Sequence, residues 1–470
     1  MSHGGEGEAV ARLRIILNPA SGVPGLSDKV YRSRVKPLLD TLSQDKSRTI
    51  NVWEYVTERE GDGVRIGQEI RAEIDAEEGA SQTVYAILFG GDGTTHEFLN
   101  GFILEDGSSA KESQSRADVR VQLAVVPTGT ANALYAGLYP PGSSTESSSD
   151  EHEWRLRSVR ALINSLADAP TDDRTAAPST LVPLTLIAAT LKVPDGSHPG
   201  SGERKMLAHI ITSHALHAAI LHDSEALRKE HPGIERFKIA AQKNATVWVD
   251  GSLQLRGAAA EEVMLYDPSQ DHFIQVSEAK QRLQGPFLYI AALTTDRLEP
   301  TFVPGPFSTT AALSSAGSRS NPHPRPPGAI DLVVIRPTQS PAVQAAASAL
   351  SEEHQFAWWS AETQPIRMEY ALGPLTKITQ LMYEEGKHAF LTYPSPDPQK
   401  EHASIKDEVL ESSGAGNVVV EYYRCGAYTW SPAKEDERAQ LTCVDGTIVR
   451  ATQTDVEVLG SWTDKTGVWR

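Results

Sequence analysis

The chain has 470 residues, of which 40% are hydrophobic and 22% charged, and its formal net charge is -17 at pH 7. These values are typical of a folded protein with sizeable hydrophobic cores and about two or three domains. The acidic balance argues against bulk nucleic-acid binding and against simple electrostatic adhesion to anionic lipid.

Cysteine content and hydropathy indicate the compartment in which the protein is expected. Cys425 and Cys443 are the only cysteines, which gives neither a disulfide framework nor a cysteine metal site. The polar N-terminus is unlike a signal or transit peptide, and no apolar run approaches the roughly 20 residues of a membrane span. We therefore expect a cytoplasmic protein without a transmembrane segment, whose contact with intracellular membranes, if any, is peripheral.

Strand-like and helix-like segments alternate over the first 140 residues. Strands are expected at 12–18, 51–56, 84–90 and 121–126, and helices at 29–43 and 64–76 and after each of the last two strands. Pro37 interrupts the helical period of the segment 29–43. The alternation predicts an open, largely parallel α/β sheet with ligands at the carboxyl ends of its strands.

The segment 84–101, VYAILFGGDGTTHEFLNG, is the clearest functional motif. A buried strand runs into a glycine turn at 90–93, and Thr94 and Thr95 begin a helix. This geometry directs backbone N–H groups and the positive end of a helix toward an anion. Asp92 would repel a phosphate unless a metal or a proton transfer uses it. The motif therefore predicts a nucleotide phosphate site with Asp92 as base or Mg²⁺ partner. A plain strand-to-helix turn is the alternative.

Two other strand ends carry small polar residues. The first strand is followed by NPASG at 18–22, and the fourth by PTGTANAL at 127–134. Neither these turns nor the glycine turn has the spacing of a P-loop or of a dinucleotide fingerprint. Three such turns on the strands of one sheet favour a ligand site over three unrelated helix caps.

The pattern changes after Pro178. Short β-favouring runs separated by turn signals occupy 184–192, 206–212, 246–249, 287–293, 329–336, 418–423 and 441–449. This spacing predicts a mostly antiparallel β domain. A probable helix covers 342–354.

The three strand-end motifs resemble a known family. NPASG at 18–22, GGDGTTHEFLNG at 90–101 and PTGTANALYA at 127–136 are similar, in order and spacing, to the first blocks of the diacylglycerol kinase catalytic domain superfamily, and most of all to sphingosine and ceramide kinases. The resemblance implies an α/β nucleotide-binding domain at 10–168 and a β-sandwich lipid domain at 178–455, with a tail at 456–470 as a candidate for return to the first domain. It also implies ATP, Mg²⁺ and phosphorylation of a hydroxyl on a sphingoid base, ceramide or diacylglycerol-type lipid.

The resemblance also assigns roles to residues. Asp92 would be the base that takes the proton of the lipid hydroxyl. Contacts to the nucleotide would come from the strand-end loops, through Asn18, Pro19, Ala20, Thr57, Gly90, Gly91, Gly93, Glu97, Gly129, Thr130 and Ala131. The family usually has glycine where this chain has Ala131.

The later blocks of the family are altered in this chain. Arg228 and Arg236 match two arginines that lie near the phosphates, and Asp445 keeps the first residue of an Asp-Gly-Glu block. The glutamate of that block is Thr447 here. An Asp-x-Asp that meets the polar head of the lipid in sphingosine kinases is replaced by Ala219 and Leu221. These losses favour an uncharged lipid head group over a cationic amine, and they leave the substrate-binding residues undefined.

Three functions are compatible with the sequence. A lipid kinase acting at a membrane surface explains the motifs best. An NAD kinase shares the GGDG turn, but its acidic site for the nicotinamide ribose has no counterpart that we can place. A non-catalytic nucleotide or lipid-binding protein would explain the lost carboxylates. From the sequence alone, Asp92→Asn should abolish the rate of a kinase and largely spare its nucleotide binding.

Overall fold

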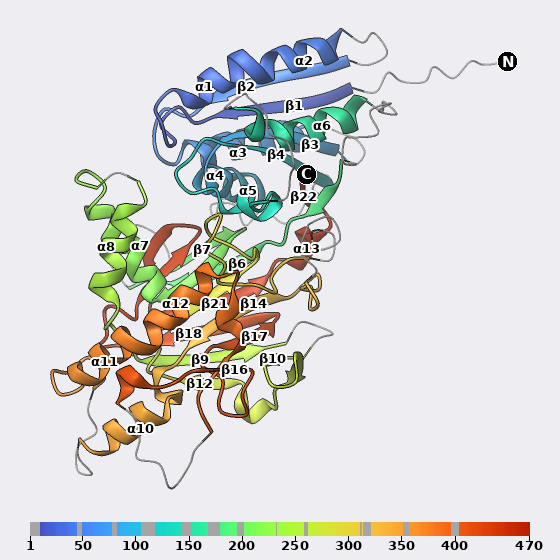
Figure 1. The fold of residues 1–470 in the computed structure, drawn as a ribbon. Helices are drawn as coiled ribbons and strands as arrows, with labels where there is room; N and C mark the ends of the chain where they lie inside the picture. The colour runs from blue at the N-terminus through green and yellow to red at the C-terminus, as the bar shows by residue number, and fades with distance from the viewer. Residues whose placement is uncertain are drawn as a thin grey trace. The chain divides into compact units, whose positions relative to one another are not determined.

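The computed structural model describes residues 10–44, 49–77, 82–104, 118–142, 152–167, 179–194, 202–231, 233–257, 262–310, 313, 321–350, 357–395 and 404–470. The chain forms two compact units (Figure 1). The first comprises Met1–Thr185 together with Ser461–Arg470, and the second comprises Leu186–Gly460.

The first unit is built on a six-stranded sheet, and the predicted parallel α/β architecture is confirmed. Its strands lie in the order β2 (Thr49–Val56), β1 (Val10–Leu17), β3 (Gln82–Gly90), β4 (Val119–Pro127), β22 (Thr466–Trp469) and β5 (Leu181–Pro183). All neighbours pair in parallel except β22 and β5. The last strand of the chain therefore completes the sheet of the first unit, next to β4.

Helices cover both faces of this sheet. One face packs against α1 (Leu26–Val30), the π-helical turn η1 (Tyr31–Val35), α2 (Lys36–Ser43) and α6 (Arg157–Ala167). Arg14 of β1 points to the opposite face from its neighbour Ile15 and pairs with Glu73 of α3 (Asp62–Asp75) at 2.9 Å. Next to α3 lies α4 (Asp92–Ile103), and α5 (Ala133–Leu138), η2 (Glu153–Leu156) and α13 (Gly460–Thr463) are shorter.

The second unit is an antiparallel β-sandwich, as predicted. One sheet has the order β11 (His272–Gln275), β10 (Met264–Asp267), β17 (Glu421–Cys425), β14 (Ile330–Ile335), β13 (Tyr289–Leu293), β8 (Ile211–Ala215), β19 (Leu441–Val444) and β20 (Thr447–Arg450). The other has the order β12 (Arg282–Gln284), β9 (Gly251–Arg256), β18 (Ala427–Pro432), β21 (Gln453–Val458), β6 (Ile187–Lys192) and β7 (Glu203–Ala208). Alternate apolar side chains of both sheets form one buried core.

Shorter elements surround the sandwich. The helices are α7 (Leu216–Ala226), α8 (Glu235–Asn244), α10 (Pro341–Ser348), α11 (Gln364–Tyr370), the π turn η5 (Ala371–Leu375) and α12 (Thr376–Tyr383). Single 3-10 turns are η3 (Glu278–Lys280), η4 (Pro337–Gln339), η6 (Lys387–Phe390) and η7 (Ile405–Asp407), and β15 (Leu391–Thr392) pairs with β16 (Glu411–Ser412). Along α7, the apolar residues Ala218 and Ala219 pack on Leu441 and Cys443 of β19.

Two segments differ from the sequence-based expectation. The run 441–449 is a hairpin and not one strand, because Asp445 and Gly446 adopt the positive φ values of a tight turn, 46° and 94°. Pro37 does not interrupt its helix. The π-helical turn Tyr31–Val35 directly precedes α2, so Pro37 lies in the first turn of that helix, where its missing N–H is tolerated.

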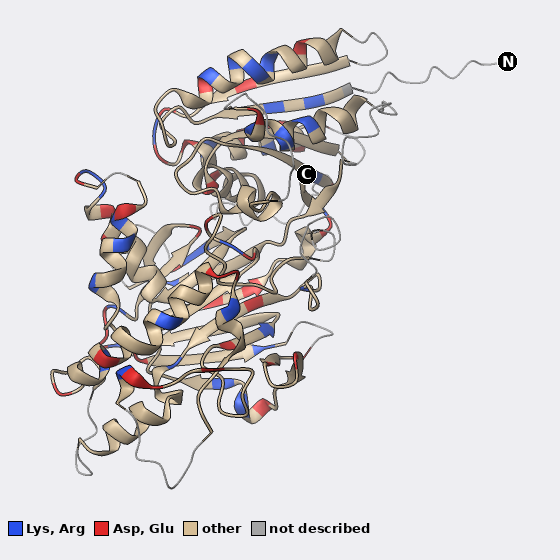
Figure 2. Cartoon of the chain, in the orientation of Figure 1, with Lys and Arg blue, Asp and Glu red and all other residues tan. Residues whose placement is uncertain are grey.

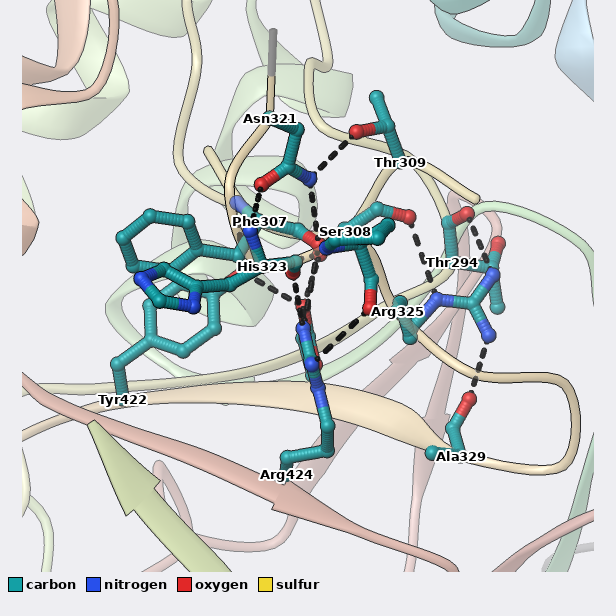
Figure 3. A network of polar contacts seen from close by, with 12 residues as sticks. Thr294, Phe307, Ser308, Thr309, Asn321, His323, Arg325, Ala329, Tyr422 and Arg424 are labelled. Carbon is teal, nitrogen blue, oxygen red and sulfur yellow. Dashed lines mark hydrogen bonds and ion pairs between the residues drawn. The ribbon is translucent and has the colours of Figure 1, made fainter. Parts of the chain in front are cut away.

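A buried polar network fixes the loops above β14 and β17 (Figure 3). Asp331 accepts hydrogen bonds from Arg424 at 2.8 Å and from the Tyr422 hydroxyl at 2.9 Å. The same guanidinium donates to the carbonyl of His323 at 3.0 Å, and Arg325 donates to that of Ser308 at 3.2 Å. Removal of one partner would leave a buried charge unpaired, so the network specifies a single path for these loops.

Asp250 makes the stability of the second unit depend on pH. Burial and, secondarily, the charge of Asp436 raise the pKa of Asp250 to about 6. Because its pKa is raised in the folded state, the Asp250 carboxyl favours folding when it is protonated. This stabilisation is present below about pH 4 and is lost as the pH rises through 6.

We expect Asp250→Asn to flatten this pH dependence. At pH 7.5 the variant should be more stable than the parent by about 1 kcal/mol, less than the full shift implies because Asp250 is partly exposed. Urea unfolding at pH 4, 6 and 7.5 measures the effect. Glu435→Gln, the same charge change at an exposed position of a facing loop, is the matched control, and an equal response of both variants would contradict the assignment.

Candidate functional site

Backbone hydrogen bonds join the strand ends that carry the sequence motifs. The Asn18 N–H donates to the Phe89 carbonyl at 3.0 Å, and the Thr57 N–H donates to the Leu17 carbonyl at 2.9 Å. Across the next pair of strands, the Thr128 N–H donates to the Gly90 carbonyl at 3.0 Å. The motifs at 18–22, 57–63, 90–93 and 127–132 therefore lie together at the carboxyl edge of the parallel sheet, where α/β proteins bind their ligands.

At two glycines, Gly129 and Gly22, a neighbouring loop approaches too closely for any side chain to fit. A Cβ on Gly129 would lie 2.5 Å from the Cα of Gly91. A Cβ on Gly22, whose φ is +64°, would lie 2.1 Å from the Thr128 carbonyl oxygen. Glycine is required at both positions because backbone of one loop fills the space in which a side chain of the other would stand.

Asn18 links the first loop to α4. Its Nδ2 donates to Thr94 Oγ1 at 3.0 Å, and its Oδ1 accepts the N–H of Ala20 at 3.2 Å. The hydroxyl of Ser27 donates to the Asn18 carbonyl at 2.8 Å and lies 2.9 Å from Thr128 Oγ1. Sequence reasoning missed Thr94, Ser27 and Thr128. Thr94 lies inside the most specific motif, whereas the partnership of Ser27 and Thr128, 101 residues apart, has no local signal.

Asp92, the predicted base, is hydrogen-bonded to the third loop. Its Oδ2 accepts the N–H of Ala133 at 2.7 Å, and its Oδ1 accepts that of Leu134 at 3.1 Å. Asp92 lines a pocket of about 10 Å³ together with Gly91, Asn132 and Tyr135, which is room for about one water molecule. Asp92 thus anchors the third loop in addition to any role in chemistry.

Glu97 holds the second loop. Its two carboxylate oxygens accept the N–H groups of Gly61 at 3.2 Å and of Gly63 at 3.0 Å. Nearby, Asp62 accepts the N–H of Glu58 at 2.8 Å, and this hydrogen bond lowers the pKa of Asp62. The nucleotide contact assigned to Glu97 stays a prediction, and in the structure this side chain positions the loop that follows Thr57.

Arg228 and Arg236 belong to the second unit and lie near one another. Arg228 is exposed and pairs with Glu225 at 2.6 Å. Burial, and then the charge of Arg228, lower the pKa of Arg236. Among the described residues, Arg236 Nε has no hydrogen-bond partner. Figure 2 marks both acidic and basic positions along the ribbon of α7 and α8. Two neighbouring guanidinium groups, of which Arg228 pairs with Glu225, suit an anion.

Asp445 holds the turn between β7 and β8. Its carboxylate accepts the N–H groups of His209 at 2.7 Å, Ile210 at 3.0 Å and Ile211 at 2.9 Å. It also lies 2.6 Å from His209 Nδ1, and the Asp445 side chain has no exposed surface. The nucleotide contact assigned to Asp445 stays a prediction, and in the structure its oxygens hold the turn between β7 and β8.

We expect Glu97→Ala to loosen the second loop. Loss of two charge-assisted hydrogen bonds should reduce the free energy of unfolding by about 1–2 kcal/mol and weaken ATP binding. Urea unfolding and nucleotide titration measure the two effects. The control is Glu69→Ala on α3, which removes only the exposed ion pair with Arg65 at 2.7 Å and should change stability by less than about 0.5 kcal/mol. Equal effects of both variants would contradict the role given to Glu97.

The comparisons with known proteins agree with the motifs. Residues 12–160 match the model of the diacylglycerol kinase catalytic domain, and this match supports a lipid kinase, that is, a phosphotransferase. No curated protein matches the chain. No helix in the described part of the chain is long and apolar enough to cross a membrane.

Similar solved structures are diacylglycerol kinases of Bacillus anthracis str. Sterne. One, described as a "putative diacylglycerol kinase", has 13% identity and a TM-score of 0.45. A second has 13% identity and a TM-score of 0.42. Each comparison covers 96% of this chain and 95% of the other. TM-scores below 0.5 are too low to support conclusions, so the classification rests on the sequence match. Residues 12–160 are similar to the diacylglycerol kinase catalytic domain family.

Proposed function

We propose that the protein is an ATP-dependent lipid kinase that phosphorylates a hydroxyl of a lipid with an uncharged head group. The observation that carries this proposal is the glycine turn 90–93 at the start of α4, joined to two other strand-end loops. The turn presents backbone N–H groups and a helix N-terminus suited to phosphates, with Asp92 as the one carboxylate inside it.

In the proposed reaction, Asp92 accepts the proton of the lipid hydroxyl while the hydroxyl oxygen bonds to the γ-phosphorus of ATP. ADP leaves with the electrons of the broken P–O bond. The loops around Asn18, Gly91 and Gly129 hold the phosphates in line with the hydroxyl. Catalysis of this kind depends on positioning and on neutralisation of charge more than on covalent chemistry.

Mg²⁺ would neutralise charge on the transferred phosphoryl group. Among the described residues, no group of three or more His, Cys, Asp and Glu side chains could form a metal cage. This fits Mg²⁺, which proteins commonly bind through one or two carboxylates and the phosphates of the substrate. Asp92 would be the hard oxygen ligand of this turn. Its oxygens accept N–H groups in the structure, so the metal would share this carboxylate with the third loop.

Helix α7 supports an uncharged lipid head group. It carries the two positions, Ala219 and Leu221, at which sphingosine kinases have carboxylates. Its own carboxylates, Asp223 and Glu225, both pair with arginines, at 3.0 Å and 2.6 Å respectively. Burial opposes ionisation of Asp223, but hydrogen bonds led by that from Arg438 outweigh it and hold the pKa of Asp223 well below its ordinary value.

A further polar side chain of α7, His217, is neutral. His217 Nδ1 lies 2.7 Å from the Ser213 hydroxyl, and burial lowers the pKa of His217 to about 4. The imidazole is therefore uncharged at pH 7. Ceramide, diacylglycerol and other acylated alcohols match such a surface better than a sphingoid amine, which needs a carboxylate partner for a strong hydrogen bond.

A non-catalytic binding protein is the competing function, because the carboxylates at 219, 221 and 447 of the family are absent. An NAD kinase is the second alternative, since it shares the GGDG turn. Transfer of labelled phosphate from ATP and Mg²⁺ to a micellar panel separates the three. The panel holds ceramide, diacylglycerol, monoacylglycerol and sphinganine, with NAD as the water-soluble comparator.

We expect ceramide or a glycerolipid to be labelled. Asp92→Asn should remove the label and, unlike the expectation from sequence alone, should also weaken ATP binding severalfold, because an amide cannot accept both N–H groups from the third loop. Preferential labelling of sphinganine would contradict the argument from α7. Labelling of NAD alone, or ATP binding without any transfer, would favour the alternatives.

We expect Leu221→Asp to shift the preference toward an amine. Leu221 is partly exposed, so a carboxylate is tolerated there, whereas Ala219 is 2% exposed and is not suitable. The ratio of sphinganine to ceramide phosphorylation should rise about tenfold, the effect of one charge-assisted hydrogen bond. Leu221→Asn is the matched uncharged control. An unchanged ratio in Leu221→Asp would place the head group away from α7.

A further inference from the structure

The third loop contains an unused acceptor beside Asp92. Asn132 stands at the position that precedes α5, where Asn side chains commonly accept a backbone N–H of the first turn. Here its side chain makes no such bond. Among the described residues, Asn132 Oδ1 is buried and has no hydrogen-bond partner. A buried acceptor in that state is unfavourable, so it needs an explanation.

The orientation of the Asn132 amide is fixed by its other end. Nδ2 donates to the Gly129 carbonyl at 2.8 Å, and a carbonyl oxygen can only accept, so Oδ1 cannot exchange places with Nδ2. Oδ1 lies 3.8 Å from the point where a Cβ on Gly91 would stand, and Asn132 and Asp92 line the same small pocket. The unused acceptor is thus held next to the glycine turn.

Asp92 has taken an N–H group, that of Leu134, that Asn132 would otherwise serve as a capping residue. The carboxylate accepts the N–H of Ala133 at 2.7 Å and of Leu134 at 3.1 Å. A carboxylate is the stronger acceptor, because its hydrogen bonds are charge-assisted. Asn132 is held away with a backbone φ of -141° and ψ of 59°, outside the extended region typical of a capping residue. Asp92 and Asn132 are therefore competing acceptors for the N–H of Leu134.

We propose that Asn132 is a positioning residue that takes over the N–H of Leu134, at the start of α5, when Asp92 turns to the substrate. This inference rests on the proposed function, in which Asp92 accepts the proton of the lipid hydroxyl. A protonated carboxyl is a weaker acceptor than a carboxylate, and a carboxylate that moves toward the hydroxyl is lost to the loop. Rotation of Asn132 into the capping conformation would then keep the start of α5 in place during turnover.

Amide hydrogen exchange at residues 133–139 tests whether Asn132 replaces Asp92 as acceptor, and it needs no measurement of activity. In the parent protein, Asn132→Ala should change the exchange rate by less than twofold, because Oδ1 has no bond to lose and the bond that Nδ2 loses goes to the Gly129 carbonyl and to none of these amides. In Asp92→Ala, where Asn132 is expected to cap the loop, addition of Asn132→Ala should accelerate exchange by a further factor of about 2 to 30, the range expected for loss of an Asn cap.

Equal effects of Asn132→Ala in the two backgrounds would overturn the proposal. So would no effect in either background, which is the result expected if a bound water satisfies Oδ1 in both states. Asp92→Asn offers a milder background should Asp92→Ala fail to fold, because one acceptor is retained. The comparison of Asn132→Ala in these two backgrounds does not depend on lipid phosphorylation. It therefore remains informative if the parent protein transfers no phosphate and the proposed function fails.

Kinetics of the Asn132 variants give the second readout. Asn132→Ala should lower kcat about tenfold while the KM for ATP changes by less than twofold, because the resting loop keeps its bonds to Asp92. Asn132→Ser should restore most of the rate, since a serine hydroxyl also caps well. If Asn132→Ser is as slow as Asn132→Ala, or if both are as fast as the parent, Asn132 has no positioning role in turnover.

Discussion

The hydrogen bonds of Asp92 to Ala133 and Leu134 are the interaction on which the candidate site depends. They tie the start of α4 to the start of α5, across the boundary between β3 and β4. The glycine at 129 makes the approach possible, because a side chain there would collide with Gly91. Without an acceptor at position 92, two buried N–H groups of the third loop would lose their partners at a cost of about 1–3 kcal/mol each.

With the proposed function, this arrangement gives one carboxylate two tasks that compete. As an anchor, Asp92 must stay charged and in contact with the third loop. As the proposed base, it would give up part of that interaction when it receives a proton. A substitution at Asp92 therefore measures the loss of both tasks together, and its effect on rate overstates the contribution of proton transfer. Glu97 has no such conflict in the structure, because its oxygens serve only the second loop among the contacts described.

The sequence predicted what depends on local pattern and missed what depends on distant partners. The parallel strands and their glycine turns were predicted correctly, because hydrophobic runs and turn residues are local signals. The partners of Asp92 and Glu97 lie 41 and 36 residues away and have no such signal. The hairpin at Asp445 lies within the single β-favouring run expected at 441–449. The resemblance had named the tail 456–470 as a candidate for return to the first domain, but the pairing of β22 with β4, across more than 300 residues, has no local signal.

The second unit shows how lost family carboxylates can be informative. Another carboxylate of α7 could replace the two that the family has at positions 219 and 221. Such a carboxylate should lack a cationic partner within the protein, so that it can bind the lipid amine. Asp223 instead lies within 3.3 Å of both Arg438 and Lys243, and Glu225 pairs with Arg228. The negative charge of the helix is thus balanced within the unit, while Ala218 and Ala219 bury against β19. If α7 meets the lipid as proposed, a cationic head group would find no unbalanced carboxylate among the described contacts of this helix, which would suit an amide or ester better than an amine.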